Sequence, residues 1–393
     1  MLPEMNLHIL LYLAIAILLS LVSSKLIKLI KLPNVTGYLI IGLLFGPYCI
    51  NLIPQSAVGA LSIIPTVALG FIAFSIGAEF RISFLKKVGK TPIVIAIAES
   101  LGAVLIVDLV LIVTGNDVPF SICLGAIAAA TAPAATLMVV RQYKAKGEVT
   151  DTLMAVVAID DATALIFFGI STAIAKAIEN GSTDSMLMTV LDPLIEIVSA
   201  ILLGAVAGVA LRFITKWFHS RGNRLAAVYM TVFLCVGLGE MLGLSALLMC
   251  MMLGAVFANT SSESDKVFEL TDRITPPIFM LFFFLSGAAL DVTLIPSVGV
   301  IGILYVLFRV VGKVGGAWAG GKLSHASAKT QKYLGFMLVP QAGVAIGLAT
   351  TAMSVVPAYG PRIRTIILCG TVIYELTGPV ITKLALKKAG EIT

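Results

Sequence analysis

Long apolar segments, separated by short polar or proline- and glycine-containing breaks, follow one another along the whole chain. A helix that crosses the hydrocarbon core of a bilayer needs about 20 mostly apolar residues, and the segments have roughly this length. The pattern therefore predicts an all-α polytopic membrane protein with about thirteen transmembrane helices. These lie at residues 6–30, 34–53, 58–78, 91–114, 119–140, 151–176, 189–216, 225–241, 244–260, 275–290, 294–321, 331–355 and 364–386.

The composition agrees with this pattern and excludes an ordinary soluble protein. Of the 393 residues, 59% are hydrophobic and 12% are charged, and the mean hydropathy is +1.05. Soluble domains are about 45–50% apolar and about 25% charged. No stretch between the apolar segments is polar enough to form a soluble domain. We therefore expect residues 1–393 to form a single membrane domain in contact with the lipid bilayer.

Most of the 27 basic residues fall in short loops on one side of the predicted helices. Cytoplasmic loops carry an excess of Lys and Arg, so the pattern predicts a cell-membrane protein with its N-terminus outside and its C-terminus in the cytoplasm. This placement explains the net charge of +6 without a nucleic-acid partner. The five cysteines show no C-x-x-C spacing and the three histidines lie near segment ends, so we expect neither a disulfide framework nor a cysteine or histidine metal site. We expect no cofactor.

Two short sequence matches predict an internal repeat. The segment 40–46 resembles 252–258, and 74–83 resembles 284–293, each about 210 residues further along. This offset contains an odd number of predicted helices, so the two copies have opposite orientation, as in the inverted-topology repeats of transporters. The predicted halves are residues 34–176 and 225–388, and the helix at 189–216 links them.

Asp160 and Asp161 are adjacent in the middle of the predicted helix 151–176. A charged group at the bilayer centre costs about 2.5–3.5 kcal/mol on insertion scales and indicates function. Because adjacent helix positions point about 100° apart, the two carboxylates cannot face one partner. We expect protein to neutralise one of them and water to reach the other.

Arg309 and Lys313 supply the candidate countercharge in the predicted helix 294–321. They are four positions apart, so they share one helix face. Lys313 lies too deep for its ammonium to reach the membrane surface easily, which predicts a partner inside the membrane. Arg309 has an alternative partner in Glu99, in the helix 91–114.

Prolines interrupt two of the predicted helices in mid-span. Thr131 and Pro133 lie in the helix 119–140, and Pro340 and Gln341 lie in the helix 331–355. A proline within a helix removes a hydrogen bond and frees a carbonyl group, and such breaks are tolerated at membrane depth where they line a polar cavity. The two breaks occupy corresponding positions in the predicted halves, which indicates a binding site.

A carboxylate that water reaches at the membrane centre can bind either a proton or a small cation, and this competition produces exchange. If the lysine–aspartate pair breaks and the lysine also loses a proton, two protons move against one cation. An intramembrane aspartyl protease is the enzyme alternative, but its two acids must face each other, which neighbours on one helix cannot do. A sodium-coupled organic-anion symporter and a channel stay open as alternatives.

The segments GLLFGP (42–47), FSIGAEF (74–80) and FFFLSGAALD (282–291), together with the twin aspartates and the Arg309–Lys313 helix, resemble the monovalent cation:proton antiporter-2 family, specifically its NapA-like sodium/proton antiporters. The resemblance implies a core domain for transport, with helices 91–176 and 294–355, and a scaffold domain that forms a homodimer. It further implies that the two discontinuous helices cross.

For the site, the resemblance implies that Asp161 is the principal carrier of Na⁺, or of Li⁺, and of protons, and that Asp160 pairs with Lys313. It implies electrogenic exchange, and a K⁺/H⁺ antiporter of the same family is the nearest alternative. Many relatives carry an aspartate where this chain has Ala132, which leaves Thr131 and backbone carbonyls as the local ligands.

Overall fold

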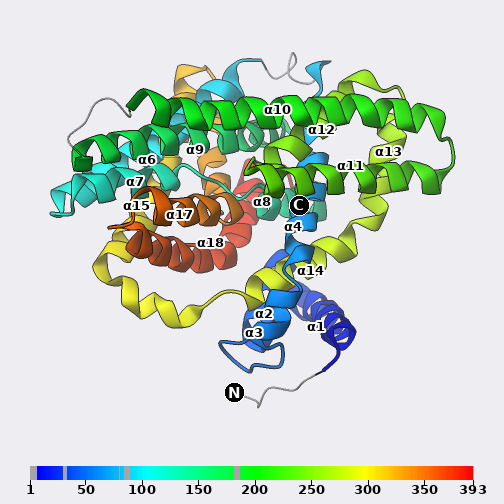
Figure 1. Ribbon diagram of the computed structural model, residues 1–393, viewed down its shortest axis with the longest axis horizontal. Coiled ribbons are helices and arrows are strands. Elements are labelled where there is room, and N and C mark those ends of the chain that lie inside the picture. The colour runs from blue at the N-terminus through cyan, green and yellow to red at the C-terminus, as the bar shows by residue number, and fades with distance from the viewer. Residues whose placement is uncertain (1–6, 30–32, 79, 84–88, 181–185, 393) are drawn as a thin grey trace. The chain divides into compact units, whose positions relative to one another are not determined.

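Every element in the described part of this computed structural model is a helix (Figure 1). The structure describes residues 7–29, 33–78, 80–83, 89–180 and 186–392, and inside some helices it does not describe every side chain. The chain divides into two compact units. The first comprises residues 1–87 and 195–289, and the second comprises residues 88–194 and 290–393.

Several of the described helices suit a membrane. Seven described segments are long and apolar enough to cross a bilayer, or eight if a bent pair of helices counts as one span. Four shorter apolar helices, of 10–17 residues, accompany them. The protein is thus a multi-pass, all-helical membrane protein, while the count of thirteen spans stays a prediction.

The first unit is built around four short apolar helices. Its elements are α1 (Ile9–Leu29), α2 (Asn34–Phe45), α3 (Gln55–Ala60), α4 (Ile63–Gly77), most of α10 (Met186–Trp217), α11 (Arg221–Leu242), α12 (Ala246–Thr260), α13 (Ser264–Ile274) and α14 (Pro276–Ala288). Helix α2 packs on α14, and α4 packs on α12. Lipid chains are as apolar as these side chains, so close van der Waals packing rather than water exclusion holds such helices together.

Glycines allow the backbones of these pairs to touch. A Cβ atom at Gly42 of α2 would collide with the carbonyl of Phe284 in α14, and a Cβ atom at Gly254 of α12 would collide with the carbonyl of Phe74 in α4. The two contacts correspond under the sequence offset of about 210 residues, which relates Gly42 to Gly254 and Phe74 to Phe284. These matched contacts support the predicted inverted repeat, which stays a prediction.

Two predictions for the first unit are wrong, one on where a helix ends and one on a segment expected to be a loop. The helix predicted over 34–53 ends at Phe45, because Pro47 lacks an amide hydrogen and favours an extended residue before it. The segment after α12, treated as a loop in the sequence, contains the helix α13. Asp265 in its first turn pairs with Arg81, and Glu263, the residue before the helix, pairs with Arg224 of α11.

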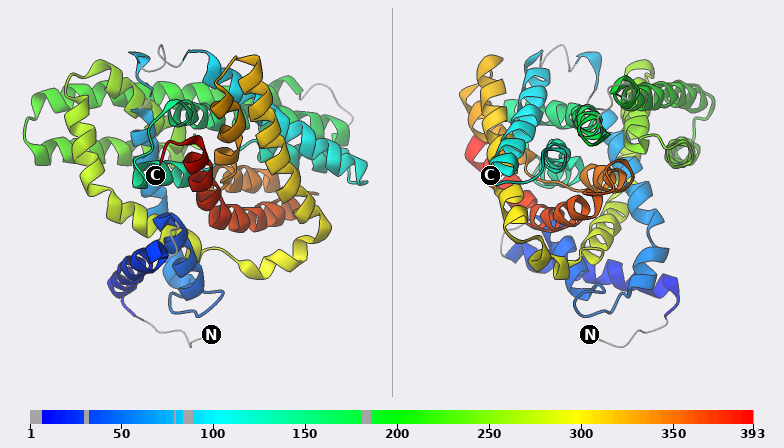
Figure 2. Two further views of the ribbon diagram at one scale, coloured as in Figure 1. Left: turned by 180° about the vertical axis from the view of Figure 1, so that it is seen from behind. Right: turned by 60° about the vertical axis from the view of Figure 1, so that its left-hand side comes forward.

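The second unit contains both predicted groups of core helices, 91–176 and 294–355. Its elements are α6 (Thr91–Val113), α7 (Val118–Ala128), α8 (Pro133–Gln142), α9 (Glu148–Asn180), η1 (Val292–Val298), α15 (Gly299–Leu323), α16 (Ala328–Tyr333), η2 (Leu334–Leu338), α17 (Gly343–Val355) and α18 (Gly360–Ala389). Helix α18 lies in this unit as well, outside the predicted core ranges. Helices α6 and α15 lie side by side (Figure 2).

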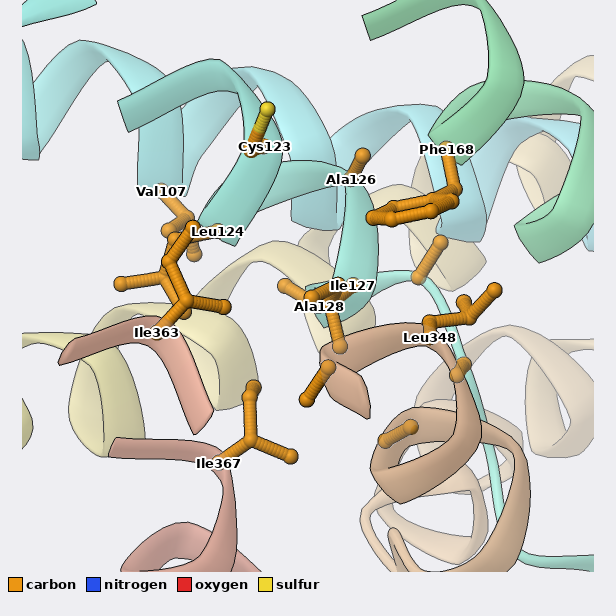
Figure 3. Close-up of a cluster of buried hydrophobic side chains, with 14 of the residues drawn as sticks. Val107, Cys123, Leu124, Ala126, Ile127, Ala128, Phe168, Leu348, Ile363 and Ile367 are labelled. Atoms are coloured by element: carbon orange, nitrogen blue, oxygen red, sulfur yellow. The ribbon is translucent and has the colours of Figure 1, made fainter. Parts of the chain in front are cut away.

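A buried apolar cluster holds the helices of the second unit together. Figure 3 shows side chains from five helices converging, including Val107 of α6, Leu124 of α7, Phe168 of α9, Leu348 of α17 and Ile363 of α18. Several members come from α7, which ends at the first proline break, and from α17, which begins after the second. The cluster therefore fixes the ends of the broken helices.

A candidate ion site at two helix breaks

The first break separates α7 from α8. Helix α7 ends at Ala128 and α8 begins at Pro133. The residue before that proline, Ala132, is extended, with φ −97° and ψ 100°, as the proline ring requires of its neighbour. Proline suits the first position of α8 because an amide hydrogen there would have no partner within the helix.

The second break separates η2 from α17. The helix pair 328–338 and 343–353 is bent by 54°, and Pro340 and Gln341 lie between its two parts. The two breaks meet, because the backbone amide of Ala132 donates a 2.8 Å hydrogen bond to the carbonyl of Pro340. Both predicted proline interruptions are therefore breaks, and the fold brings them together.

Arg309 satisfies the carbonyl groups that the breaks leave open. Its guanidinium donates to the carbonyls of Ala128 at 3.0 Å, Ala130 at 2.7 Å and Val339 at 2.7 Å. It lies 4.5 Å above the ring of Tyr374 and is fully buried. The final carbonyls of a helix have no partner in the helix and carry partial negative charge. The arginine therefore supplies both the hydrogen bonds and the positive charge that these ends need.

Lys313, one turn further along α15, lies at the centre of the ionisable groups. Its Nζ lies 3.0 Å from Oδ2 of Asp160, 2.8 Å from Oε2 of Glu99 and 2.6 Å from Oγ1 of Thr131. It also donates to the carbonyl of Ala129 in the first break. The side chains of Lys313, Glu99 and Asp160 have no solvent exposure. This ammonium thus links α6, α9 and the first break.

Asp160 is held on both of its carboxylate oxygens. Oδ2 faces Lys313, and Oδ1 accepts a 2.8 Å hydrogen bond from the hydroxyl of Ser100 on α6. Thr163 lies beside them, with its hydroxyl 2.8 Å from that of Ser100. A buried carboxylate is tolerated when it is paired and hydrogen-bonded in this way.

Gln341 connects the second break to the first. Its amide nitrogen donates to the carbonyl of Ile127 near the end of α7 at 3.0 Å, and the hydroxyl of Tyr305 lies 2.9 Å away. Both side chains are fully buried. The second break is therefore fixed to α7 and to α15 by side chains as well as by the backbone.

The structure brings most of the predicted site residues together but changes one pairing. Glu99 pairs with Lys313 and not with Arg309, whose guanidinium is occupied by carbonyls. Helices α6 and α15 place Glu99 at the level of Gly316, because a Cβ atom on Gly316 would lie 2.7 Å from Cα of Glu99. Arg309 lies about 10 Å further along the helix axis.

Asp161, the principal predicted ion carrier, belongs to α9, but its side chain lies outside the described part of the structure. Sequence reasoning did not identify three residues that contact the site, namely Ser100, Thr163 and Tyr305. They carry no charge and are not prolines, so neither of the two signals that indicate the site in the sequence applies to them. A polar residue directly beside Glu99 in an apolar helix is the signal that indicates Ser100.

The second unit thus contains a buried ammonium, two carboxylates and the open ends of two broken helices within hydrogen-bond reach. Carboxylate, hydroxyl and carbonyl oxygens are the ligands that hard cations prefer. A carboxylate can also take up a proton, so an acidic residue here can exchange one positive ion for another.

Comparisons with known proteins identify the family and the fold of the chain. Residues 12–388 match the family described as "Sodium/hydrogen exchanger, transmembrane". The chain is 22% identical over 353 residues to Cation/H(+) antiporter 20 of Arabidopsis thaliana, covering 80% of this chain and 41% of that protein. It therefore spans about two fifths of the length of that curated relative.

Two solved structures of the sodium proton antiporter MjNhaP1 from Methanocaldococcus jannaschii share the fold. One, at pH 8, has a TM-score of 0.69 at 20% identity and covers 97% of this chain and 96% of its own. The other, from electron microscopy, has a TM-score of 0.78 at 21% identity and covers 97% and 98%.

Proposed function

The chain belongs to the sodium/hydrogen exchanger family of membrane proteins, and on that premise we propose that it is a secondary active antiporter that exchanges a monovalent cation for protons. The observation that carries the proposal is the contact between Lys313 and Asp160, 3.0 Å apart and fully buried beside two helix breaks. Charged side chains inside a membrane are costly, and they mark ion pathways and proton relays.

The cation and protons compete for Asp161 and Asp160. Asp161 is the principal carrier, and Asp160 contributes when the cation draws it away from Lys313. Thr131 and the carbonyls of the first break are further oxygen ligands near the site. Na⁺ is the proposed cation, and Li⁺ suits the same ligands. The name of the Arabidopsis relative does not say which cation that protein exchanges. K⁺ exchange is therefore the alternative that the experiment must distinguish from Na⁺ exchange.

The exchange is electrogenic in this proposal, with two protons moving against one cation. A transmembrane potential contributes about 2.3 kcal/mol per charge per 100 mV, so it can drive the cation out of the cell. The NapA-like subtype, alternating access by a moving core domain, and the inverted repeat with crossed broken helices complete the proposed mechanism. We further propose a homodimer in the cell membrane with its N-terminus outside and its C-terminus in the cytoplasm.

The experiment uses purified full-length protein in liposomes that contain a pH-sensitive dye. Na⁺, Li⁺ or K⁺ is added outside, with and without a clamped membrane potential. Proton movement that depends on one cation and responds to the potential is the expected result. An absence of proton movement with all three cations, from protein shown to be folded, contradicts antiport.

Asp161→Asn is the matched variant. It keeps the shape of the side chain and cannot ionise, so exchange should be lost while the protein stays folded. If Asp161→Asn exchanged cations for protons as the unmodified protein does, Asp161 would not be the carrier.

A further inference from the structure

The ammonium of Lys313 faces two carboxylates from two different helices. Glu99 of α6 lies 2.8 Å from Nζ, and Asp160 of α9 lies 3.0 Å from it. All three side chains are fully buried. The proposed exchange so far uses only one of these carboxylates, which leaves the role of Glu99 open.

The ammonium of Lys313 has oxygen partners other than Asp160. An ammonium group has three donors, and the three hydrogen bonds of Lys313 go to Ala129, Thr131 and Asp160. Oε2 of Glu99 lies 2.8 Å from the same ammonium but takes part in no hydrogen bond. When Asp160 turns towards a cation, the hydrogen bonds to Ala129 and Thr131 remain, and the donor that Asp160 gives up can turn to Oε2 of Glu99. Lys313 then keeps hydrogen-bond partners for its donors and a negative countercharge, so its protonated form stays favourable.

Two ionised carboxylates beside one buried ammonium leave an uncompensated negative charge, which is unfavourable in an apolar interior. Arg309, the other cation near these carboxylates among the described side chains, directs its charge at backbone carbonyls. Helix α7, which also packs on α6, carries no acidic or basic residue, and Asp108 of α6 is nine residues away from Glu99. In the absence of a cation, one of the two carboxyl groups therefore holds a proton.

The hydroxyl of Ser100 lies between the two carboxyl groups. It is 3.1 Å from Oε1 of Glu99 and 2.8 Å from Oδ1 of Asp160. Asp160 accepts hydrogen bonds on both oxygens from Lys313 and Ser100, which favours its ionised form. Glu99 is left as the group that holds the proton.

Building on the proposed exchange, we propose that Glu99, and neither Asp160 nor Lys313, carries the second transported proton, and that Lys313 stays protonated throughout the cycle. When a cation draws Asp160 away, Glu99 releases its proton to water and becomes the counter-ion of Lys313. When the cation leaves, Asp160 returns to Lys313 and Glu99 takes up a proton. One proton leaves Asp161 and one leaves Glu99 for each cation that enters.

The test counts the protons that the purified protein in detergent releases into weakly buffered solution when saturating Na⁺ is added, over a series of pH values. The unmodified protein should release two at its maximum. Glu99→Gln cannot ionise and should release one, with cation affinity reduced about tenfold or more because Lys313 loses its counter-ion. Glu99→Asp restores a titratable group and should again release two.

Lys313→Arg separates the two possible carriers of the second proton, because an arginine side chain stays charged at every working pH. It should still release two protons if Glu99 carries the second one. Release of two protons by Glu99→Gln, or of one proton by a folded Lys313→Arg protein, overturns the proposal.

If Lys313→Arg does not fold, the comparison of Glu99→Gln with Glu99→Asp decides by itself. Failure of the proposed function is a different result, since the unmodified protein would then release no protons with Na⁺, Li⁺ or K⁺.

Discussion

The backbone amide of Ala132 donates a 2.8 Å hydrogen bond to the carbonyl of Pro340, which joins the two chain breaks of the second unit directly. Arg309 completes the junction, because its guanidinium bonds to carbonyls of both breaks, at Ala130 and at Val339. Each break alone would leave backbone groups without partners inside a membrane, where no water can replace them. The two breaks are therefore stable only together.

Replacement of Arg309 should destabilise the protein strongly. Arg309→Met leaves three buried carbonyls without donors, and each costs about 1–3 kcal/mol. We expect a loss on the order of 3–5 kcal/mol in the free energy of unfolding, measured by thermal unfolding in detergent. Arg309→Lys should be intermediate, since it keeps the charge but cannot reach three carbonyls.

Arg364 provides the control for this prediction. It lies on α18 and is exposed, so Arg364→Met should change the stability little. Equal losses from Arg309→Met and Arg364→Met would show that the carbonyl contacts of Arg309 do not stabilise the junction.

The sequence predicts the parts of the site that charge and proline indicate. Lys313 stands out because a lysine in mid-membrane needs a partner, and Pro133 and Pro340 stand out because they interrupt helical hydrogen bonding. These signals are local, so one sequence suffices to find them. They place the breaks and the basic residues without any knowledge of packing.

The pairing of Glu99 could not be predicted in the same way, because it depends on the register between two helices. The glycines of α15 set this register, with Gly312 against Ala103 and Gly316 against Glu99. A change of one turn would bring Arg309 closer to Glu99, and the sequence alone does not distinguish these registers. The helix α13 could not be predicted for another reason. Its charged residues are typical of a loop, and its ion pairs, Asp265 with Arg81 and Glu263 with Arg224, join residues far apart in the sequence.

Gly316→Ala should separate α6 from α15. A Cβ atom at this position would lie 2.7 Å from Cα of Glu99, and it would collide with the carbonyl of Ala98. Overpacking of this kind costs about 1–3 kcal/mol, and it moves Glu99 away from Lys313. We expect a lower melting temperature and weaker binding of the cation, measured on the same preparation.

Gly315 is the matched control, because nothing lies within 4 Å of a Cβ atom placed there. Gly315→Ala removes a helix-weakening glycine and should stabilise the protein by up to about 1 kcal/mol. If both alanine variants behaved alike, close contact at Gly316 would not be the cause.

Tyr305 and Gln341 should show energetic coupling in a double-mutant cycle. The phenol hydroxyl lies 2.9 Å from the amide nitrogen of Gln341, and a buried hydrogen bond contributes about 0.5–1.5 kcal/mol. Gln341→Leu should cost more than Tyr305→Phe, because it also removes the donor to the carbonyl of Ile127. Thermal unfolding of both single variants and the double variant measures the coupling, and additive losses would contradict it.

Glu391 caps the helix that carries the twin aspartates. Its carboxylate accepts hydrogen bonds from the backbone amides of Val149 at 2.8 Å and Thr150 at 2.7 Å, in the first turn of α9. Negative charge at a helix N-terminus is favourable because the partial charge there is positive, and loss of a cap costs about 0.5–2 kcal/mol. Glu391→Ala should therefore lower stability by this amount and speed hydrogen exchange at the start of α9.

Glu148 provides the control, because it tests whether any negative charge near this helix end has the same effect as the hydrogen bonds from Glu391. It lies in the same first turn and is exposed, so Glu148→Gln removes a charge without removing the acceptor of the two amides. We expect a change of a few tenths of a kcal/mol and unaltered exchange of the amides of Val149 and Thr150. Faster exchange of these amides in Glu148→Gln as well would mean that the charge of the first turn, and not the hydrogen bonds from Glu391, holds the start of α9.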